Sequence, residues 1–178
     1  PVYDVLSSVP ARIARSPATP MLSGASAGGG LTGASAYRLR DTVKPHPAAL
    51  VLPSPWLDLT MSNPETLAME SRDVLLSARK LNAAAESYAG GNDREQPGIS
   101  PLFGDPTGLA PSITHVGDAE MFLPEDRDWV AKCVASGIRA DLHIVPGGFH
   151  VSTAIMVLPE AKKAVVEQAA FVREVLGS

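Results

Sequence analysis

One serine has neighbours that would allow it to act as a nucleophile. Ser26 is the central residue of Gly24-Ala25-Ser26-Ala27-Gly28, which matches the pattern Gly-x-Ser-x-Gly. In this pattern the serine projects from a sharp turn between a strand and a helix, and the turn leaves no room for bulky neighbours. The short pattern also arises by chance in a chain with 15 glycines, which leaves open a glycine-rich connection without catalytic consequence. Because a strand-like segment precedes it and a helical one follows, we predict that Ser26 is a nucleophile.

A serine hydroxyl needs a base, usually a histidine, within hydrogen-bonding distance. Of the four histidines, His115 and His143 fall inside predicted strands, and His46 lies between two prolines. We expect those three to be sheet or loop residues. His150 follows the end of a predicted strand, and ligands of open parallel sheets bind at the carboxyl ends of the strands. We therefore predict that His150 is the base and lies at the same edge of the sheet as Ser26.

The carboxylate that orients the base should also follow a strand. Asp118 comes directly after the strand-like segment Ser112 to Gly117, and the order Ser26, Asp118, His150 is the order that serine hydrolases of the α/β type use. We predict that Asp118 is this carboxylate, and a role as a helix or turn cap stays open. We expect the acidic residues further on to be solvated, at the start of a helix: Glu120, Glu125, Asp126 and Asp128.

Glycines and prolines divide the chain into alternating strand-like and helical segments, which predicts an α/β fold with a parallel sheet. The predicted strands are Thr19 to Ser23, Ala48 to Ser54, Ser112 to Gly117 and Ala140 to Val145. The predicted helices are Asp4 to Ala14, Gly29 to Leu39, Val74 to Tyr88 with Asp73 as its cap, Pro124 to Ser136, and Pro159 to Leu176. These elements bring the ends of three strands, and therefore the three candidate residues, to one edge.

Composition excludes several classes of function. A chain of 178 residues fits one domain, and its apolar runs are far shorter than the roughly 20 residues that span a bilayer. Net charge is −4 and the 15 basic residues are scattered, which argues against nucleic acid as a partner.

Cys133 is the only cysteine and has no partner at zinc-ligand spacing. We therefore expect Cys133 to be an ordinary helix residue, and we expect no metal and no cofactor. One cysteine and no visible leader after Pro1 favour a cytoplasmic protein.

Five segments, in order, resemble a known family. They are Gly24-Ala25-Ser26-Ala27-Gly28-Gly29, Ser54-Pro55-Trp56-Leu57-Asp58-Leu59-Thr60, Ser100-Pro101-Leu102-Phe103, Val116-Gly117-Asp118-Ala119-Glu120 and Pro146-Gly147-Gly148-Phe149-His150. Together they resemble the hormone-sensitive-lipase-like branch of the α/β-hydrolases, which contains many bacterial carboxylesterases. The spacings between the three candidate residues are also similar. Ala25 departs from the pattern, because the family usually has Asp before the nucleophile.

The resemblance implies a carboxylic ester hydrolase that works through an acyl-enzyme. Ser26 would attack the ester, His150 would move the proton, and Asp118 would hold the imidazole. The backbone N–H of Ala27 would be one donor of the oxyanion hole. The candidate residues for the wall of a substrate pocket are Trp56, Met121, Phe122 and Phe149.

The family's His-Gly-Gly-Gly segment, which supplies further oxyanion donors, does not occur in residues 1–178. The resemblance therefore implies a single incomplete domain that lacks the N-terminal strands and the cap. We expect the strand Thr19 to Ser23 to have a bare edge, which a companion N-terminal segment or a second copy would cover. The alternative is a catalytically weak or inactive hydrolase-like scaffold or fragment that binds a small ligand or a partner.

Overall fold

The computed structural model describes residues 20–42 and 46–177. Within them, a parallel four-stranded sheet has the order β1-β2-β3-β4. The strands are β1 Leu22–Ser23, β2 Leu50–Pro53, β3 Ser112–Gly117 and β4 Ala140–Val145. All four lie within predicted strands, so the predicted α/β fold class with a parallel sheet is confirmed. The predicted helix Asp4 to Ala14 lies outside the described residues, as does Thr19.

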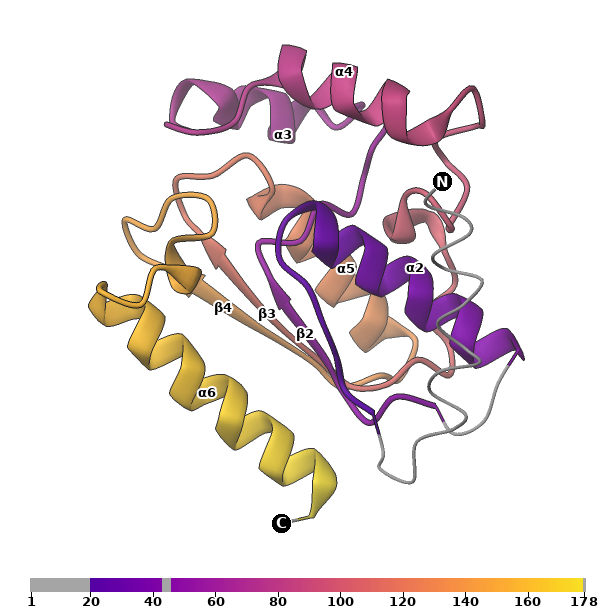
Figure 1. Ribbon diagram of the computed structural model, residues 1–178, viewed down its shortest axis with the longest axis vertical. Coiled ribbons are helices and arrows are strands. Elements are labelled where there is room, and N and C mark those ends of the chain that lie inside the picture. The colour runs from indigo at the N-terminus through magenta and orange to yellow at the C-terminus, as the bar shows by residue number, and fades with distance from the viewer. Residues whose placement is uncertain (1–19, 43–45, 178) are drawn as a thin grey trace.

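Helices and short 3₁₀ turns connect and flank the strands (Figure 1). They are α2 Ala27–Thr42, α3 Pro64–Ala68, η1 Met69–Ser71, α4 Ala78–Ala89, η2 Pro101–Phe103, α5 Leu123–Ala135, η3 Ser152–Ala154 and α6 Pro159–Leu176. The predicted helices that became α2, α5 and α6 are confirmed within a few residues at each end, and Gly137 follows α5 with a φ of 77°. None of the helices in the described part of the chain is long and apolar enough to cross a membrane.

Helices cover both faces of the sheet, with α6 on one side and α2 and α5 on the other (Figure 1). The strand β2 contributes to both layers, because neighbouring side chains of a strand point to opposite faces. Leu50 and Leu52 pack with Tyr37 of α2 and Trp129 of α5, whereas Val51 packs with Phe171 of α6. Burial on both faces explains why this strand reads as one continuous apolar run.

The helix predicted over Val74 to Tyr88 begins later than expected, at Ala78. The Asp73 carboxylate does accept hydrogen bonds from the N–H groups of Leu75 and Leu76, but these bonds close a turn rather than begin the helix. Its second oxygen accepts the N–H of Met121 at 2.8 Å. Asp73 therefore ties this turn to the loop after β3, which a local reading of the sequence does not reveal.

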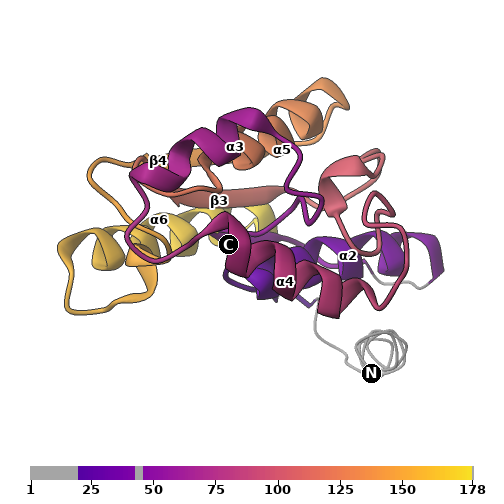
Figure 2. The same ribbon diagram turned by 90° about the horizontal axis from the view of Figure 1, so that it is seen from above.

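The short helix α3 was not predicted; its five residues lie between the predicted strand Ala48 to Ser54 and the predicted helix Val74 to Tyr88. Asn63 caps it by accepting the N–H of Glu65, and Pro64 occupies its first turn, where a proline costs no hydrogen bond. Figures 1 and 2 show α3 and α4 over the end of the molecule at which the strands finish. A core cluster that contains Trp56, Leu81 and Phe122 fills the space there.

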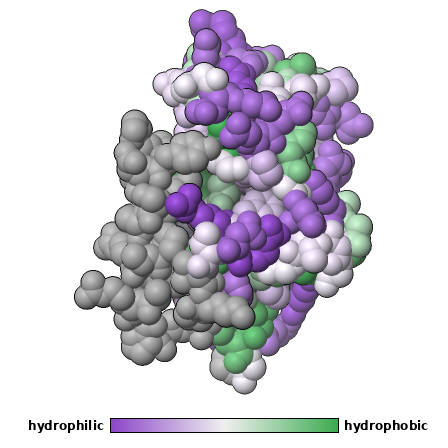
Figure 3. All heavy atoms as spheres, turned by 90° about the vertical axis from the view of Figure 1, so that its right-hand side faces the viewer, coloured by the Kyte–Doolittle hydropathy of each residue, from purple (hydrophilic) through white to green (hydrophobic). Residues whose placement is uncertain are grey.

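The described residues on the right-hand side of Figure 1 form a mainly hydrophilic surface, with small separate hydrophobic areas (Figure 3).

Cys133 of α5 is buried, and burial raises the pKa of its thiol to about 12. A thiol with so high a pKa is unreactive near neutral pH. Cys133 is therefore a core residue of this helix, as expected.

Candidate active site

Ser26 lies in a sharp turn between β1 and α2. Its φ is 55°, in the left-handed region that residues with a side chain seldom adopt. Two backbone contacts hold this conformation: the Ser26 N–H donates to the carbonyl of Pro53 at 3.2 Å and to that of Ser54 at 3.1 Å. The carbonyl of Ser26 in turn accepts the N–H of Trp56 at 2.9 Å. The segment that follows β2 thus keeps the serine side chain at the carboxyl edge of the sheet.

Close backbone approach explains two of the glycines around Ser26. A Cβ atom on Gly24 would lie 2.2 Å from the carbonyl oxygen of Gly28, and one on Gly29 would lie 2.5 Å from the side chain of Pro55. A Cβ atom on Gly28 would meet nothing within 4 Å. The expectation that both flanking glycines of Gly-x-Ser-x-Gly are sterically required is therefore wrong for the second. The next glycine along the chain carries that constraint.

His150 is in hydrogen-bonding contact with Ser26. Its Nε2 atom lies 2.9 Å from the serine Oγ, and the residue is only 7% exposed. The rings of Phe122 and His150 are nearly perpendicular, with 5.1 Å between centroids, and Phe122 stacks in turn on Trp56. These apolar rings help to fix the orientation of the imidazole. The structure thus brings together two of the three residues that the sequence singled out.

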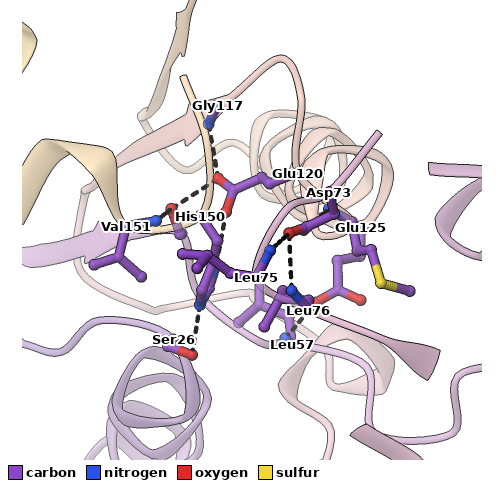
Figure 4. Close-up of polar contacts among 12 residues, drawn as sticks. Ser26, Leu57, Asp73, Leu75, Leu76, Gly117, Glu120, Glu125, His150 and Val151 are labelled. Carbon is purple, nitrogen blue, oxygen red and sulfur yellow. Dashed lines mark hydrogen bonds and ion pairs between the residues drawn. The ribbon is translucent and has the colours of Figure 1, made fainter. Parts of the chain in front are cut away.

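Glu120, and not Asp118, provides the carboxylate beside His150. Its Oε2 atom lies 2.6 Å from the Nδ1 atom of the imidazole, and the side chain is fully buried (Figure 4). This corrects the expectation for Asp118 and also the expectation that Glu120 is solvated. The physical reason is the course of the loop, which turns towards His150 only two residues after Asp118.

The other oxygen of Glu120 has two donors of its own. Oε1 accepts the N–H of Gly117 at 2.7 Å and the hydroxyl of Ser54 at 2.7 Å. Ser54 Oγ also accepts the N–H of Val151, next to His150, at 3.1 Å. A buried carboxylate needs such partners, because an unpaired one would lose its hydration without compensation. Sequence reasoning missed Ser54, and its only signal was membership of the segment that resembles the family's after β2.

Asp118 has a structural role in the same loop. It is half-buried, and its Oδ1 atom accepts the N–H of Gly147 at 2.9 Å. The backbone N–H of Asp118 donates to the carbonyl of Val145 at the end of β4. These contacts join the loop after β3 to the turn before His150. The contacts of Asp118 therefore fit the role of a turn cap, which the sequence had left open.

Two more acidic residues of this region are buried, contrary to expectation. Glu125 and Asp126, in the first turn of α5, are 1% and 0% exposed, whereas Asp128 is exposed as predicted. Glu125 Oε1 accepts the N–H of Leu57 at 2.8 Å (Figure 4). Burial raises the pKa of both carboxyl groups well above its usual range, and neighbouring carboxylates raise it further. Each group therefore holds its proton to a higher pH in the folded protein than it would in water.

An apolar cavity of about 120 Å³ lies beside the start of α2. Its lining combines Ala27, the residue after the serine, with Trp56 from the segment after β2 and Tyr88 from α4. Ala27 is the first residue of α2. The cavity thus offers an apolar space next to the residue that follows Ser26.

Of the four residues predicted to line a pocket, Trp56 alone contacts this cavity. Met121 and Phe122 are fully buried in the core cluster beneath α4, and Phe149 is half-buried and does not line it. For Met121 and Phe122 the expectation is corrected: they support the site from within the core. The cavity residues on α2 and α4 were not predicted, because their contact depends on how the helices pack.

The sequence also matches a known protein family. The sequence profile of a family described as having the α/β hydrolase fold matches residues 2–154. The chain belongs to this α/β-hydrolase family.

Individual relatives are about one third identical to the chain over the aligned residues. It is 36% identical over 157 residues to an acetyl-hydrolase of Streptomyces hygroscopicus, covering 88% of this chain and 52% of that protein. It is 32% identical to an esterase of Acinetobacter venetianus, covering 85% of this chain and 50% of that protein. The chain therefore spans about half the length of the curated relatives it matches.

Solved structures of esterases are equally similar. A crystal structure of EstE5 soaked with p-nitrophenyl butyrate gives a TM-score of 0.90 at 32% identity, covering 99% of this chain and 60% of that one. An esterase of the bacterial hormone-sensitive lipase family gives 0.89 at 32% identity, with 98% and 60% covered. The resemblance drawn from the sequence segments is confirmed.

Proposed function

We propose that the whole protein is a carboxylic ester hydrolase and that Ser26, His150 and Glu120 are its catalytic triad. The observation that carries the proposal is the unbroken line of contacts from Ser26 Oγ through the two imidazole nitrogens to the Glu120 carboxylate. The relatives named esterase and acetyl-hydrolase support the same class of reaction.

In the first half of the reaction, Ser26 Oγ attacks the ester carbonyl carbon while His150 Nε2 takes the hydroxyl proton. The carbonyl oxygen becomes an oxyanion, and the N–H of Ala27 donates a hydrogen bond to it. The tetrahedral intermediate collapses when the C–O bond to the alcohol breaks and the imidazolium returns the proton to the departing oxygen. This step leaves the acyl group on Ser26.

In the second half, water replaces the alcohol. His150 takes a proton from water as its oxygen attacks the acyl carbon, and the proton then returns to Ser26 as the acid leaves. Throughout, Glu120 keeps the Nδ1 proton on the imidazole and stabilises the imidazolium. Its negative charge is itself held by Ser54 and Gly117.

We further propose that the cavity beside Ala27 accepts a small apolar acyl or alcohol group. Its volume of about 120 Å³ limits the size of that group, and its lining is almost wholly apolar. The resemblance places further oxyanion donors in a His-Gly-Gly-Gly segment, so we propose that an upstream segment of the whole protein completes the oxyanion hole. Each missing donor typically costs 10² to 10³ in turnover, so the 178-residue chain alone should be slow.

The test is covalent labelling followed by hydrolysis. We expect a fluorophosphonate probe to label the chain once, at Ser26, and Ser26→Ala to remove the label. Ser23→Ala, which alters an exposed serine of β1, is the matched control and should label normally. Hydrolysis of p-nitrophenyl acetate and butyrate should likewise disappear in Ser26→Ala alone. If the chain and a version extended by the upstream segment are both no more reactive than Ser26→Ala, the esterase proposal fails and the binding scaffold replaces it.

A further inference from the structure

A second group of side chains with nitrogen and oxygen ligand atoms lies on the face of the sheet that α6 covers. His115 and His143 are direct neighbours in the pairing of β3 with β4, and their rings stack with 4.7 Å between centroids. Glu167, from the middle of α6, reaches both rings. The sequence placed each histidine separately as a sheet residue, and only the register of the strands brings them together.

The three side chains place one donor atom each close together. Glu167 Oε2 lies 3.0 Å from His115 Nε2 and 3.3 Å from His143 Nδ1, and all the donor atoms lie within 4.8 Å of one another. Two ligands of a tetrahedral zinc ion, at bond lengths of 2.0–2.1 Å, are roughly 3.3 Å apart. Among the described residues, no other group of three such side chains has its donor atoms this close.

The group is partly enclosed and has open space beside it. The side chain of His115 is 1% exposed, and those of His143 and Glu167 are 35% and 26% exposed. They line a cavity of about 400 Å³ together with Val145 and Lys163. An ion could enter from solvent through this cavity, and water could complete its coordination from the same side.

We propose that His115, His143 and Glu167 form a binding site for a divalent transition metal ion of the zinc class. Two imidazoles and one carboxylate, with a position left for water, form a donor set that Zn²⁺ accepts readily. The ion would replace the proton that His115 and Glu167 now share. It would join β3, β4 and α6 at a point outside the triad.

Glu167 places a carboxylate oxygen within 3.3 Å of both imidazoles, and this negative charge favours a cation. Burial lowers the pKa of His115, against the opposing effect of its hydrogen bond with Glu167. Partial burial of Glu167 acts to raise the pKa of its carboxyl group, but the neighbouring histidines lower it overall. Among the described residues that line the cavity, Lys163 carries an opposing charge: its ammonium group lies 3.6 Å from the other oxygen of Glu167, on a mostly exposed side chain.

The site would stabilise the elements that carry the triad. The loop with Glu120 follows β3 directly, and the turn that leads to His150 follows β4. An ion that binds only the folded chain shifts the unfolding equilibrium towards it. We therefore expect the melting temperature to rise as the Zn²⁺ concentration increases.

The experiment titrates the untagged, chelator-treated 178-residue chain with ZnCl₂ by calorimetry and with CoCl₂ by visible absorption. We expect one equivalent of either metal to bind, and the bound Co²⁺ to show the visible bands of a four-coordinate ion. Both His143→Gln and Glu167→Gln should lose this site. Glu160→Gln, which removes the same charge from α6 beside the same cavity, is the matched control and should retain it. Lys163→Gln should bind more tightly than the wild type.

The outcomes separate the proposal from a simple hydrogen-bonded cluster. If Zn²⁺ neither binds in one equivalent nor raises the melting temperature, the proposal is overturned and the three side chains only share a proton. If the metal binds equally well to Glu167→Gln, to His143→Gln and to the wild type, it binds elsewhere and the proposal is also overturned. Circular dichroism of each variant confirms folding before the titration.

Discussion

Hydrogen bonds to both of its oxygens hold the Glu120 carboxylate beside His150. One of its oxygens faces His150, and the other is held by the Ser54 hydroxyl and the Gly117 N–H. Gly117 ends β3 and Ser54 directly follows β2. Because both donors belong to the ends of neighbouring strands, they hold the carboxylate beside the imidazole. Ser54 also accepts the N–H of Val151 and so links the acid loop to the histidine loop.

We expect Glu120→Gln to reduce turnover by roughly 10³ to 10⁴, as loss of the orienting carboxylate does in serine proteases. The amide would present a donor where the imidazole or Ser54 also donates, and the imidazole would lose the tautomer that accepts the serine proton. The rate constant for fluorophosphonate labelling measures the effect even where turnover is slow.

The matched variant is Asp118→Asn, which keeps an oxygen for the Gly147 N–H. We expect it to label at nearly the wild-type rate. The reverse result, with Asp118→Asn slow and Glu120→Gln unaffected, would assign the orienting role to Asp118 as the sequence first suggested.

Among the elements, the turn from β1 into α2 depends most on backbone proximity. Gly24 faces the carbonyl of Gly28 across the turn, at a distance that no Cβ atom tolerates, whereas Gly28 itself has open space. The sequence pattern has a glycine at both positions, but only Gly24 is required to be glycine by its close contact with the backbone.

We expect Gly24→Ala to destabilise the fold by about 1–3 kcal/mol or more, because overpacking here displaces backbone rather than a flexible side chain. Gly28→Ala should be neutral or should stabilise α2 by up to about 1 kcal/mol, since alanine favours helix. Urea unfolding measures both. Equal destabilisation of the two variants would show that the turn does not have the backbone contacts described here.

A carboxyl group at the start of α5 is buried without a hydrogen-bond partner. Both oxygens of Asp126 lack one among the described residues. Burial, and then the charges of Glu125 and Glu120, raise the pKa of this group well above its usual range. The folded chain therefore keeps a proton on Asp126 at pH values where the unfolded chain has lost it.

This difference predicts a pH dependence of stability. As pH rises above the ordinary aspartate pKa of about 3.9, the unfolded state releases its proton first, so the free energy of unfolding falls by up to about 1.4 kcal/mol per pH unit until the raised pKa is reached. Asp126→Asn should remove this contribution and flatten the decline. Asp128→Asn should flatten it less, because that residue of the same helix is exposed and burial raises the pKa of its carboxyl group by a smaller amount. Urea unfolding from pH 4.5 to 8 measures the slopes, and identical slopes for the wild type and Asp126→Asn would contradict the assignment.

For the molecule as a whole, the outer side of β1 carries an exposed apolar region. Among the described strands β1 pairs with β2 alone, and a groove of about 410 Å³ runs between it and α6. Met21, Val165 and Val172 line this groove, and the first two are 47% and 44% exposed. Unpaired strand edges beside apolar surface invite association with another chain segment.

We expect the 178-residue chain alone to self-associate with increasing concentration, and Met21→Lys to reduce that association by placing a charge in the groove. Val157→Lys, at an exposed position between η3 and α6, is the control and should have no effect. Light scattering during gel filtration gives the masses. A strictly monomeric wild-type chain would rule out the need for a companion segment at this edge.

The sequence by itself determined the α/β class, the four strands, and Ser26 and His150 as partners. These features depend on local patterns: a small-residue turn, buried apolar runs, and the rule that loops after parallel strands share one edge. The family segments added independent support.

Only the tertiary structure decided which carboxylate reaches His150, because Asp118 and Glu120 differ by two residues in a loop whose course depends on Asp73, Ser54 and the turn at Gly147. The same holds for the pairing of His115 with His143 beside Glu167, which requires the strand register and the position of α6. Contacts between residues far apart in sequence leave no periodic pattern, so composition and spacing could not reveal them.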